Sequence, residues 1–252
     1  MSELILNPES EVVIFFGPRG KGKSTLMGHF VDDYLKTQGD KRWELSEQLI
    51  REENAERKSP LSFPDKPPIY TNTKYKNLKT RAGKDFEPFP IKGKEIGVTN
   101  DNESYKYLFP APLIALDEAH KEFAAKGDSL PNGQLEFFME CRHDRIIMLL
   151  AAPRAVLINK DIRASGSRFI EPRKVINEFD SFKRLYKTTW YCREFLETSA
   201  IEEYISTNGK SDGYVETTYV HNGNIREICD SYAFKRRFYP PEGKDFETYH
   251  KH

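Results

Sequence analysis

The chain has 252 residues, of which 38% are hydrophobic and 31% charged, and its formal net charge at pH 7 is zero. Aromatic residues make up 13%, which excludes a wholly disordered chain. A zero net charge leaves no whole-chain electrostatic argument for a nucleic-acid partner.

The three cysteines, Cys141, Cys192 and Cys229, lie far apart and match no metal-binding spacing, so we expect free thiols in a reducing compartment. The first ten residues carry no basic stretch and no long apolar core, so they do not form a signal peptide. No apolar run approaches the ~20 residues of a membrane span, so we expect no transmembrane segment.

Short apolar runs alternate with helical patterns through much of the chain. The run EVVIFFG at 11–17 is continuous, which is typical of a central parallel strand buried on both faces. Apolar residues then recur at helical spacing after residue 23, and a charge-dense helix is expected over 41–58. Further strands are expected at 69–72, 113–118, 146–152 and 188–195, and a further helix at 132–145. This alternation predicts an α/β fold with a mostly parallel sheet flanked by helices.

Two parts of the chain depart from this pattern. Residues 73–110 carry Gly, Lys and Pro throughout, so we expect a surface excursion there. From about Arg163 the alternation weakens, and Asn-Gly pairs at 208–209 and 222–223 are hairpin-type signals. We therefore predict a main domain over 1–195 and a small, irregular C-terminal extension over 196–252.

The stretch GPRGKGKS at 17–24 matches the phosphate-loop template G-x4-G-K-[ST]. Glycines permit a tight turn whose backbone N–H groups point at phosphate oxygens, and the helix that follows directs its positive end at them. We expect Lys23 to reach the β- and γ-phosphates and Ser24 to place its hydroxyl on Mg²⁺. Arg19 and Lys21 either add positive charge over the phosphates or are solvated loop cations. The predicted nucleotide-binding residues are Gly17, Pro18, Arg19, Gly20, Lys21, Gly22, Lys23, Ser24 and Thr25.

A pair of acids ends the apolar run LIALDE at 113–118. The carboxyl ends of strands are where open α/β sheets bind ligands, so we expect Asp117 to hold Mg²⁺ through water, opposite Ser24. Glu118 would orient and polarise the attacking water as a general base. The alternative is that Asp117 only caps the helical segment that follows. The acid pair favours ATP hydrolysis, and NKD at 159–161 lacks the final aspartate of a guanine-binding N-K-x-D signature.

The order of these motifs resembles the zonula occludens toxin-like (Zot) family of phage P-loop ATPases. After the phosphate loop and a long excursion comes IYTN at 69–72, similar to a family strand that ends in Thr/Ser-Asn. LIALDEAHKEF at 113–123 resembles the family's Walker B segment, and CRHDRIIMLL at 141–150 its Arg-His segment. INKDIRASGSRFIE at 158–171 is similar to the segment that follows. The resemblance covers about residues 11–195.

This resemblance implies a RecA-like core of the FtsK/HerA type, with ATP and Mg²⁺ as cofactors. It further implies a ring homo-oligomer, with a hexamer favoured, that couples ATP hydrolysis to virion assembly and export or to viral DNA translocation. The implied partners are viral DNA and phage or host-envelope assembly proteins, and the implied location is the host cytoplasm, including the periphery of the inner membrane. The chain departs from the family in lacking a membrane span and in placing Ala151, Ala152 and Pro153 where such motors carry a polar sensor.

A ring ATPase uses a cation from the neighbouring subunit to stabilise developing phosphate charge. The predicted candidates are Arg142 and Arg163, with Arg145 and Arg154 as further options. Arg142 and His143 lie near the end of the expected helix 132–145, where cations also suit the helix dipole, so a structural role stays open for both. His120 is expected to be a solvated residue.

Cations and aromatic residues interleave over 163–187, and again over 232–239. Such a patch either contacts a nucleic-acid backbone or is a solvated face over an ordinary core. The leading hypothesis for the chain is a motor-type ATPase acting on viral DNA or virion assembly. The alternatives are a genome-packaging ATPase of a tailless or short-tailed phage, a nucleotide-binding scaffold with little turnover, and, least favoured, a small-molecule kinase.

Overall fold

The computed structural model describes residues 5–63, 69–71, 87–88, 110–121, 123, 138, 141–143 and 145–228. Within these residues the strands form one sheet in the order β3-β2-β4-β5-β1-β6-β7-β8. The strands are β1 (Glu11–Phe15), β2 (Ile69–Thr71), β3 (Glu87–Pro88), β4 (Leu113–Leu116), β5 (Ile147–Ala151), β6 (Arg168–Phe179), β7 (Leu185–Phe195) and β8 (Val215–Asn222). The helices are α1 (Lys23–Thr37), α2 (Gly39–Glu56), α4 (Lys160–Ala164), α5 (Thr198–Ser206) and α6 (Ile225–Ile228), with short 3₁₀ turns at η1 (Ala119–Lys121) and η2 (Ala155–Leu157).

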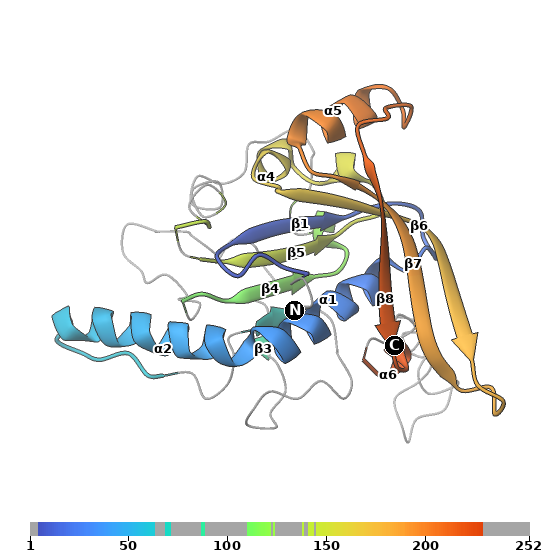
Figure 1. Cartoon of the computed structure of the whole chain (residues 1–252). Coiled ribbons are helices and arrows are strands. Elements are labelled where there is room, and N and C mark those ends of the chain that lie inside the picture. Colours follow the sequence, from blue (N-terminus) through green and yellow to red (C-terminus); the bar gives the residue numbers. More distant parts are fainter. Residues whose placement is uncertain are drawn as a thin grey trace, which may run out of the picture.

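The first half of the sheet is parallel. Every pairing from β3 through β2, β4, β5 and β1 to β6 is parallel, and the side chains of β1, β4 and β5 are all buried. Helices α1 and α2 lie on one side of this half and α4 and α5 on the other (Figure 1). The predicted α/β fold with a mostly parallel, helix-flanked sheet is therefore confirmed.

Alternate residues of β1 enter two separate cores, which explains why its sequence is apolar without interruption. Val13 and Phe15 pack with the apolar side chains of α1, whereas Val12 and Ile14 belong to the cluster on the opposite face. Phe15 meets Phe30 of α1 edge to face, with ring centroids 5.1 Å apart. The strand that carries the phosphate loop is thus fixed from both sides.

The second half of the sheet is antiparallel and corrects the prediction for the C-terminal third. Strands β6 and β7 form a long hairpin, and β8 pairs with β7 from Lys187 to Glu194, so the described residues beyond 195 extend the same sheet and are not irregular. The hairpin turns at 180–184, where the Asp180 carboxylate accepts the N–H groups of Phe182 and Arg184 at 2.9 and 2.8 Å. Neither Asn-Gly pair forms a hairpin turn, because 208–209 follow α5 and 222–223 join β8 to α6.

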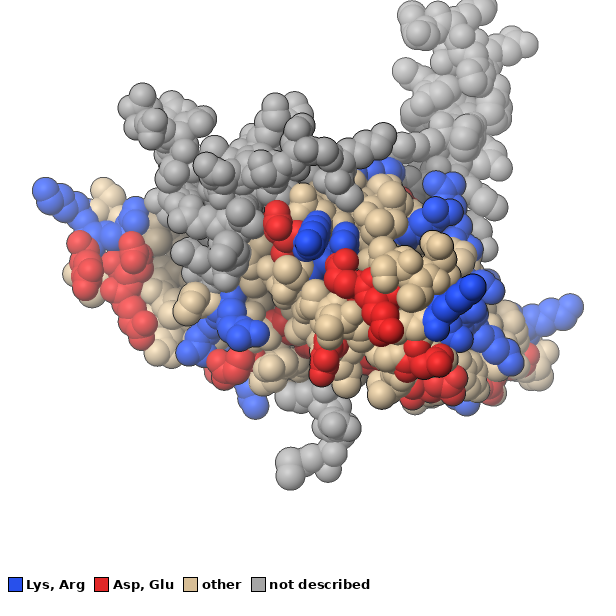
Figure 2. Space-filling view, turned by 90° about the horizontal axis from the view of Figure 1, so that it is seen from above, with Lys and Arg blue, Asp and Glu red and all other residues tan. Residues whose placement is uncertain are grey.

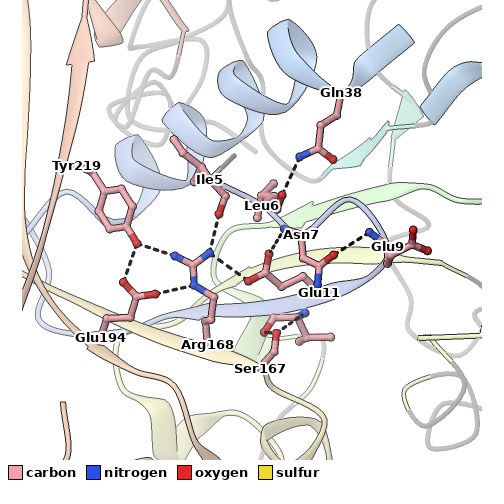
Figure 3. A network of polar contacts seen from close by, with 11 residues as sticks. Ile5, Leu6, Asn7, Glu9, Glu11, Gln38, Ser167, Arg168, Glu194 and Tyr219 are labelled. Carbon is pink, nitrogen blue, oxygen red and sulfur yellow. Dashed lines mark hydrogen bonds and ion pairs between the residues drawn. The ribbon is translucent and has the colours of Figure 1, made fainter. Parts of the chain in front are cut away.

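A buried polar network joins the two halves of the sheet (Figure 3). Arg168 donates to Glu194 Oε1 at 2.6 Å, to Glu11 Oε1 at 3.1 Å and to the Tyr219 hydroxyl at 2.7 Å. Tyr219 in turn donates to Glu194 Oε2 at 2.8 Å. Burial alone would lower the pKa of Arg168, but Tyr219 and the two carboxylates raise it above its usual value. The network links β1, β6, β7 and β8 through one guanidinium.

Several predictions fall on residues that the structure does not describe. The helix expected at 132–145 lies mostly outside the described residues, and so do the basic-aromatic run 232–239 and Cys229. Of the excursion 73–110, the described part includes β3, which pairs with β2. The domain boundary at residue 195 stays a prediction. Among the described residues no helix is long and apolar enough to cross a membrane.

Candidate nucleotide site

The stretch 17–24 lies between the end of β1 and the start of α1. The end of β1 is hydrogen-bonded on both sides, because Phe16 N–H donates to Ile170 O at 3.0 Å and Phe15 O accepts from Ala152 N–H at 2.9 Å. Residues 17–22 then turn the chain, and α1 begins at Lys23. The loop therefore leaves a rigid strand at the carboxyl edge of the sheet, where α/β folds bind ligands.

Three glycines give the loop its shape. Gly17, Gly20 and Gly22 have φ values of 125°, 79° and 80°, a region that residues with a Cβ rarely adopt. Gly22 is the N-cap residue of α1, and no described side chain caps this helix end. The dipole of α1 directs its positive end into this loop, an arrangement that attracts anions.

Lys23 directs its ammonium group back into the loop. Its Nζ donates to Gly17 O at 2.8 Å and to Pro18 O at 3.0 Å. Burial lowers the pKa of Lys23, while the nearby carboxylates of Asp117 and Glu118 raise it. The Lys23 side chain is thus buried against the start of the loop, and a cation in such a place interacts more strongly with phosphate than one in water.

Ser24 and Asp117 meet across the strand that separates them. Asp117 follows β4, and β5 lies between β4 and β1, yet the Ser24 hydroxyl donates to Asp117 Oδ2 at 2.7 Å. The other oxygen, Oδ1, accepts the Glu118 N–H at 2.9 Å. Burial raises the pKa of Asp117, and the Ser24 hydrogen bond lowers it. A hydroxyl and a carboxylate side by side beside a phosphate loop are oxygen ligands that suit Mg²⁺.

Glu118 occupies an unusual backbone conformation, with φ of 53°. Such strain in a non-glycine residue is common at functional sites. Its Oε2 lies 3.6 Å from Nε2 of His120, and both side chains are about one-quarter exposed, at 26% and 22%. The expectation that His120 is simply solvated misses this contact. No sequence motif signals this contact.

The two arginines predicted to act in trans have different surroundings. Arg163 is buried, and its guanidinium donates to both oxygens of Glu202, at 2.7 and 3.1 Å, and to Ile158 O at 2.6 Å. It ties α4 to α5 within one chain. Arg142 is exposed in a turn, next to an exposed His143. Arg142 is therefore the candidate trans cation that we retain, and its role stays a prediction.

The NKD sequence at 159–161 has a structural explanation. The Asn159 side chain accepts the Asp161 N–H at 2.8 Å and caps α4.

Most cations of the run 163–187 have acidic partners. The ion pairs are Arg163 with Glu202, Arg168 with Glu11 and Glu194, Arg173 with Glu171, Arg184 with Asp180, and Lys187 with Glu178. On the face seen in Figure 2, blue and red residues are interspersed. Internal pairing reduces the charge available to a phosphate backbone, which favours the solvated-face interpretation of this run.

Sequence reasoning also missed what supports the loop from behind. A Cβ on Gly22 would lie 2.8 Å from Nε1 of Trp190 and 2.9 Å from Cγ2 of Val175. Trp190 is fully buried, and the His29 ring of α1 stacks on it at 5.6 Å. The supporting residues come from β6 and β7, more than 150 positions along the chain, so no local pattern could reveal them.

Comparison with known proteins bears on the fold. No protein-family model matches the sequence, and no curated protein matches it significantly. The structure is similar to the N-terminal domain of zonular occludens toxin from Neisseria meningitidis, with a TM-score of 0.50 and 13% identity over 88% of this chain and 99% of that one. The genome packaging NTPase B204 of Sulfolobus turreted icosahedral virus 2, in complex with ATP-gammaS, has a TM-score of 0.42 and 12% identity over 86% of this chain and 99% of that one. The DNA-packaging ATPase B204 of Sulfolobus turreted icosahedral virus has a TM-score of 0.39 and 16% identity over 88% of this chain and 97% of that one. The first likeness shows a shared fold, which confirms the predicted resemblance at that level.

Proposed function

We propose that the chain is a Mg-dependent ATPase motor of a phage, which couples ATP hydrolysis to virion assembly and export or to movement of viral DNA. The observation that carries the proposal is the convergence of a phosphate loop, a buried lysine and an acid pair. In particular, the 2.7 Å contact between Ser24 and Asp117 joins the loop to the acidic strand end. Neither element alone would distinguish hydrolysis from simple binding.

The roles of the residues follow from their positions. Backbone N–H groups of residues 19–24 bind the phosphates, and Lys23 neutralises the charge that develops on the β–γ bridge. Ser24 and Asp117 would hold Mg²⁺, which supplies electrostatic stabilisation of the phosphates when bound. Glu118 accepts a proton from the attacking water, and His120 orients the Glu118 carboxylate. Arg142 is the proposed contribution of a neighbouring subunit in a ring, with a hexamer favoured.

Measurement of ATP hydrolysis with and without DNA tests this proposal. Lys23→Ala is expected to abolish ATP binding and turnover. Glu118→Gln should retain ATP binding and lose about 10²–10⁴-fold in turnover, the usual contribution of a general base. Lys160→Ala and Glu216→Gln make the same chemical changes at exposed positions outside the site and should leave turnover unchanged.

The partner is tested by the dependence of turnover on added single- or double-stranded DNA. Stimulation by DNA supports a motor that moves or packages the genome. A nucleotide-binding scaffold is the competing function, and the buried Ala151 and Ala152 at the end of β5, where motors carry a polar residue, favour it. ATP binding without turnover in the unaltered chain would establish the scaffold and overturn the ATPase. Light scattering with ATP tests the ring, and a monomer at all ATP concentrations would contradict a role for Arg142 in trans.

A further inference from the structure

A cavity of about 610 Å³ lies beside the phosphate loop, on the side of the sheet that carries α5. Its walls come from the start of the loop, the segment after β5, strand β6 and the end of α5. The described walls include Gly17, Pro18 and Arg19 but not Ser24, Asp117 or Glu118. The cavity therefore shares one wall with the candidate nucleotide site and is separate from the acid pair.

Glu171 lines this cavity and has an unused hydrogen-bond acceptor. The residue is only 3% exposed. Its Oε1 accepts from Arg173 Nη1 at 2.9 Å and from the Tyr204 hydroxyl at 3.2 Å. Its Oε2 is buried and has no hydrogen-bond partner among the described residues. A buried carboxylate oxygen without a donor is costly, so a ligand that brings a hydroxyl or amine donor would be stabilised there.

Positive charge surrounds the same cavity. Arg19 and Arg154 both line it, both are exposed, and neither forms an ion pair within the described part of the chain. Arg173 already neutralises Glu171, so the two other guanidiniums give the cavity a net positive character. Guanidinium groups bind phosphate through paired N–H donors. Tyr204 adds an aromatic wall of the kind on which bases stack.

We propose that this cavity is a second ligand site, which takes a nucleotide unit separate from the one in the phosphate loop. Arg19 and Arg154 bind its phosphate, and Glu171 accepts a hydrogen bond from its sugar hydroxyl or base amine. The volume falls in the range of ordinary small-molecule sites. The same chemistry is offered by a free nucleotide and by one residue of a polynucleotide strand.

Binding to the full chain carrying Lys23→Ala tests the proposal, because this change removes the loop cation that is expected to hold the β- and γ-phosphates. Changes to residues that line the cavity then show whether a bound probe lies there and not in the loop. Fluorescently labelled AMP and a labelled oligodeoxyadenylate, whose bases carry an exocyclic amine, are titrated separately and followed by anisotropy. At least one of them is expected to bind. Added Arg154→Ala and Glu171→Gln should each weaken that binding about tenfold or more, the usual effect of losing a hydrogen bond to a charged group. Arg226→Ala removes an exposed arginine of α6 that does not line the cavity, and should have no effect.

The outcomes separate the sources and the alternatives. Binding of AMP identifies a free nucleotide as the ligand, and binding of the oligonucleotide alone identifies a strand. The proposal requires that at least one probe, AMP or the oligonucleotide, binds to the Lys23→Ala chain and also to the unaltered chain, and it is overturned if neither probe does so. It is also overturned if Glu171→Gln leaves the binding of AMP and of the oligonucleotide as tight as before. Urea unfolding of each variant shows whether it is folded. ATP turnover plays no part in this measurement. Absence of ATPase activity would therefore not contradict the second site, and absence of binding at the second site would not contradict the ATPase.

Discussion

His29 gives the protein a pH dependence that follows from its surroundings. It lies on α1, is 7% exposed, and stacks on Trp190 with its Nδ1 3.3 Å from Nδ1 of His221. Burial, and secondarily the neighbouring His221, lower the pKa of His29 from its ordinary value of 6.5 to about 4. The other charged groups that face it are Asp32, which opposes the shift, and Lys36, which adds to it.

The sign and size of the effect follow from linkage. Because the folded-state pKa is depressed, the unfolded chain binds the proton more readily between pH 6.5 and 4, and folding loses stability as pH falls through this window. The full shift corresponds to about 3 kcal/mol, and between pH 7 and 5 the free energy of unfolding should fall by about 2 kcal/mol from this residue. Burial also lowers the pKa of His221, so its contribution has the same sign.

Urea unfolding at pH 7, 6 and 5, followed by tryptophan fluorescence, measures this loss. His29→Phe keeps an aromatic ring against Trp190 and removes the titrating group, so this variant should lose about 2 kcal/mol less than the unaltered chain over the same range. His143→Phe, at an exposed histidine, is the control and should lose as much stability as the unaltered chain. Equal losses in the His29→Phe variant and the unaltered chain would refute the reasoning.

Other changes test the loop, the polar network and the metal site. Gly22→Ala should weaken ADP binding and lower stability more than Gly20→Ala. The two glycines have nearly the same φ, but a Cβ at Gly22 would lie 2.8 Å from Trp190 Nε1, whereas a Cβ at Gly20 meets nothing within 4 Å. Calorimetry measures ADP binding and urea unfolding measures stability, and equal effects of the two changes would contradict the clash. Arg168→Leu leaves buried carboxylates unpaired and should lower the free energy of unfolding by about 3–5 kcal/mol, and a loss below ~1 kcal/mol in urea unfolding would show that the network is not stabilised as described. Ser24→Ala should weaken ADP binding about tenfold with Mg²⁺ and leave it unchanged with EDTA, and an equal loss in both conditions would place the Ser24 hydroxyl on the phosphate and not on the metal.

The parallel half of the fold was predictable because its signals are local. Strand β1 is buried on both faces, so its sequence is apolar at every position after Glu11, and α1 follows with apolar residues at helical spacing. The same is true of β4 and β5, whose residues are all buried. The phosphate-loop template was equally readable, because its glycines and Lys23 all lie within the single stretch 17–24.

Of the antiparallel half, the expected strand at 188–195 lies within β7, whereas β6 and β8 were not predicted, for a physical reason. Strand β6 carries charged residues whose partners are remote, and Arg168, for example, pairs with Glu11, 157 positions earlier. In sequence such residues indicate a solvated surface, whereas in the fold they are satisfied internally. The excess of cations that suggested a nucleic-acid patch has the same origin in part, since Arg163 also meets a distant carboxylate, that of Glu202, 39 positions later.

The phosphate loop packs against the antiparallel half of the sheet, which was harder to predict from the sequence. The loop contacts it at both ends, because Gly17 lies against Glu171 of β6 and Gly22 lies against Trp190 of β7. His29 extends the second contact along α1. Closely packed interfaces transmit displacement, since few voids absorb it. Strands β6 and β7 therefore support the conformation of the loop 17–24, and the hairpin belongs to the candidate site as much as the motif does.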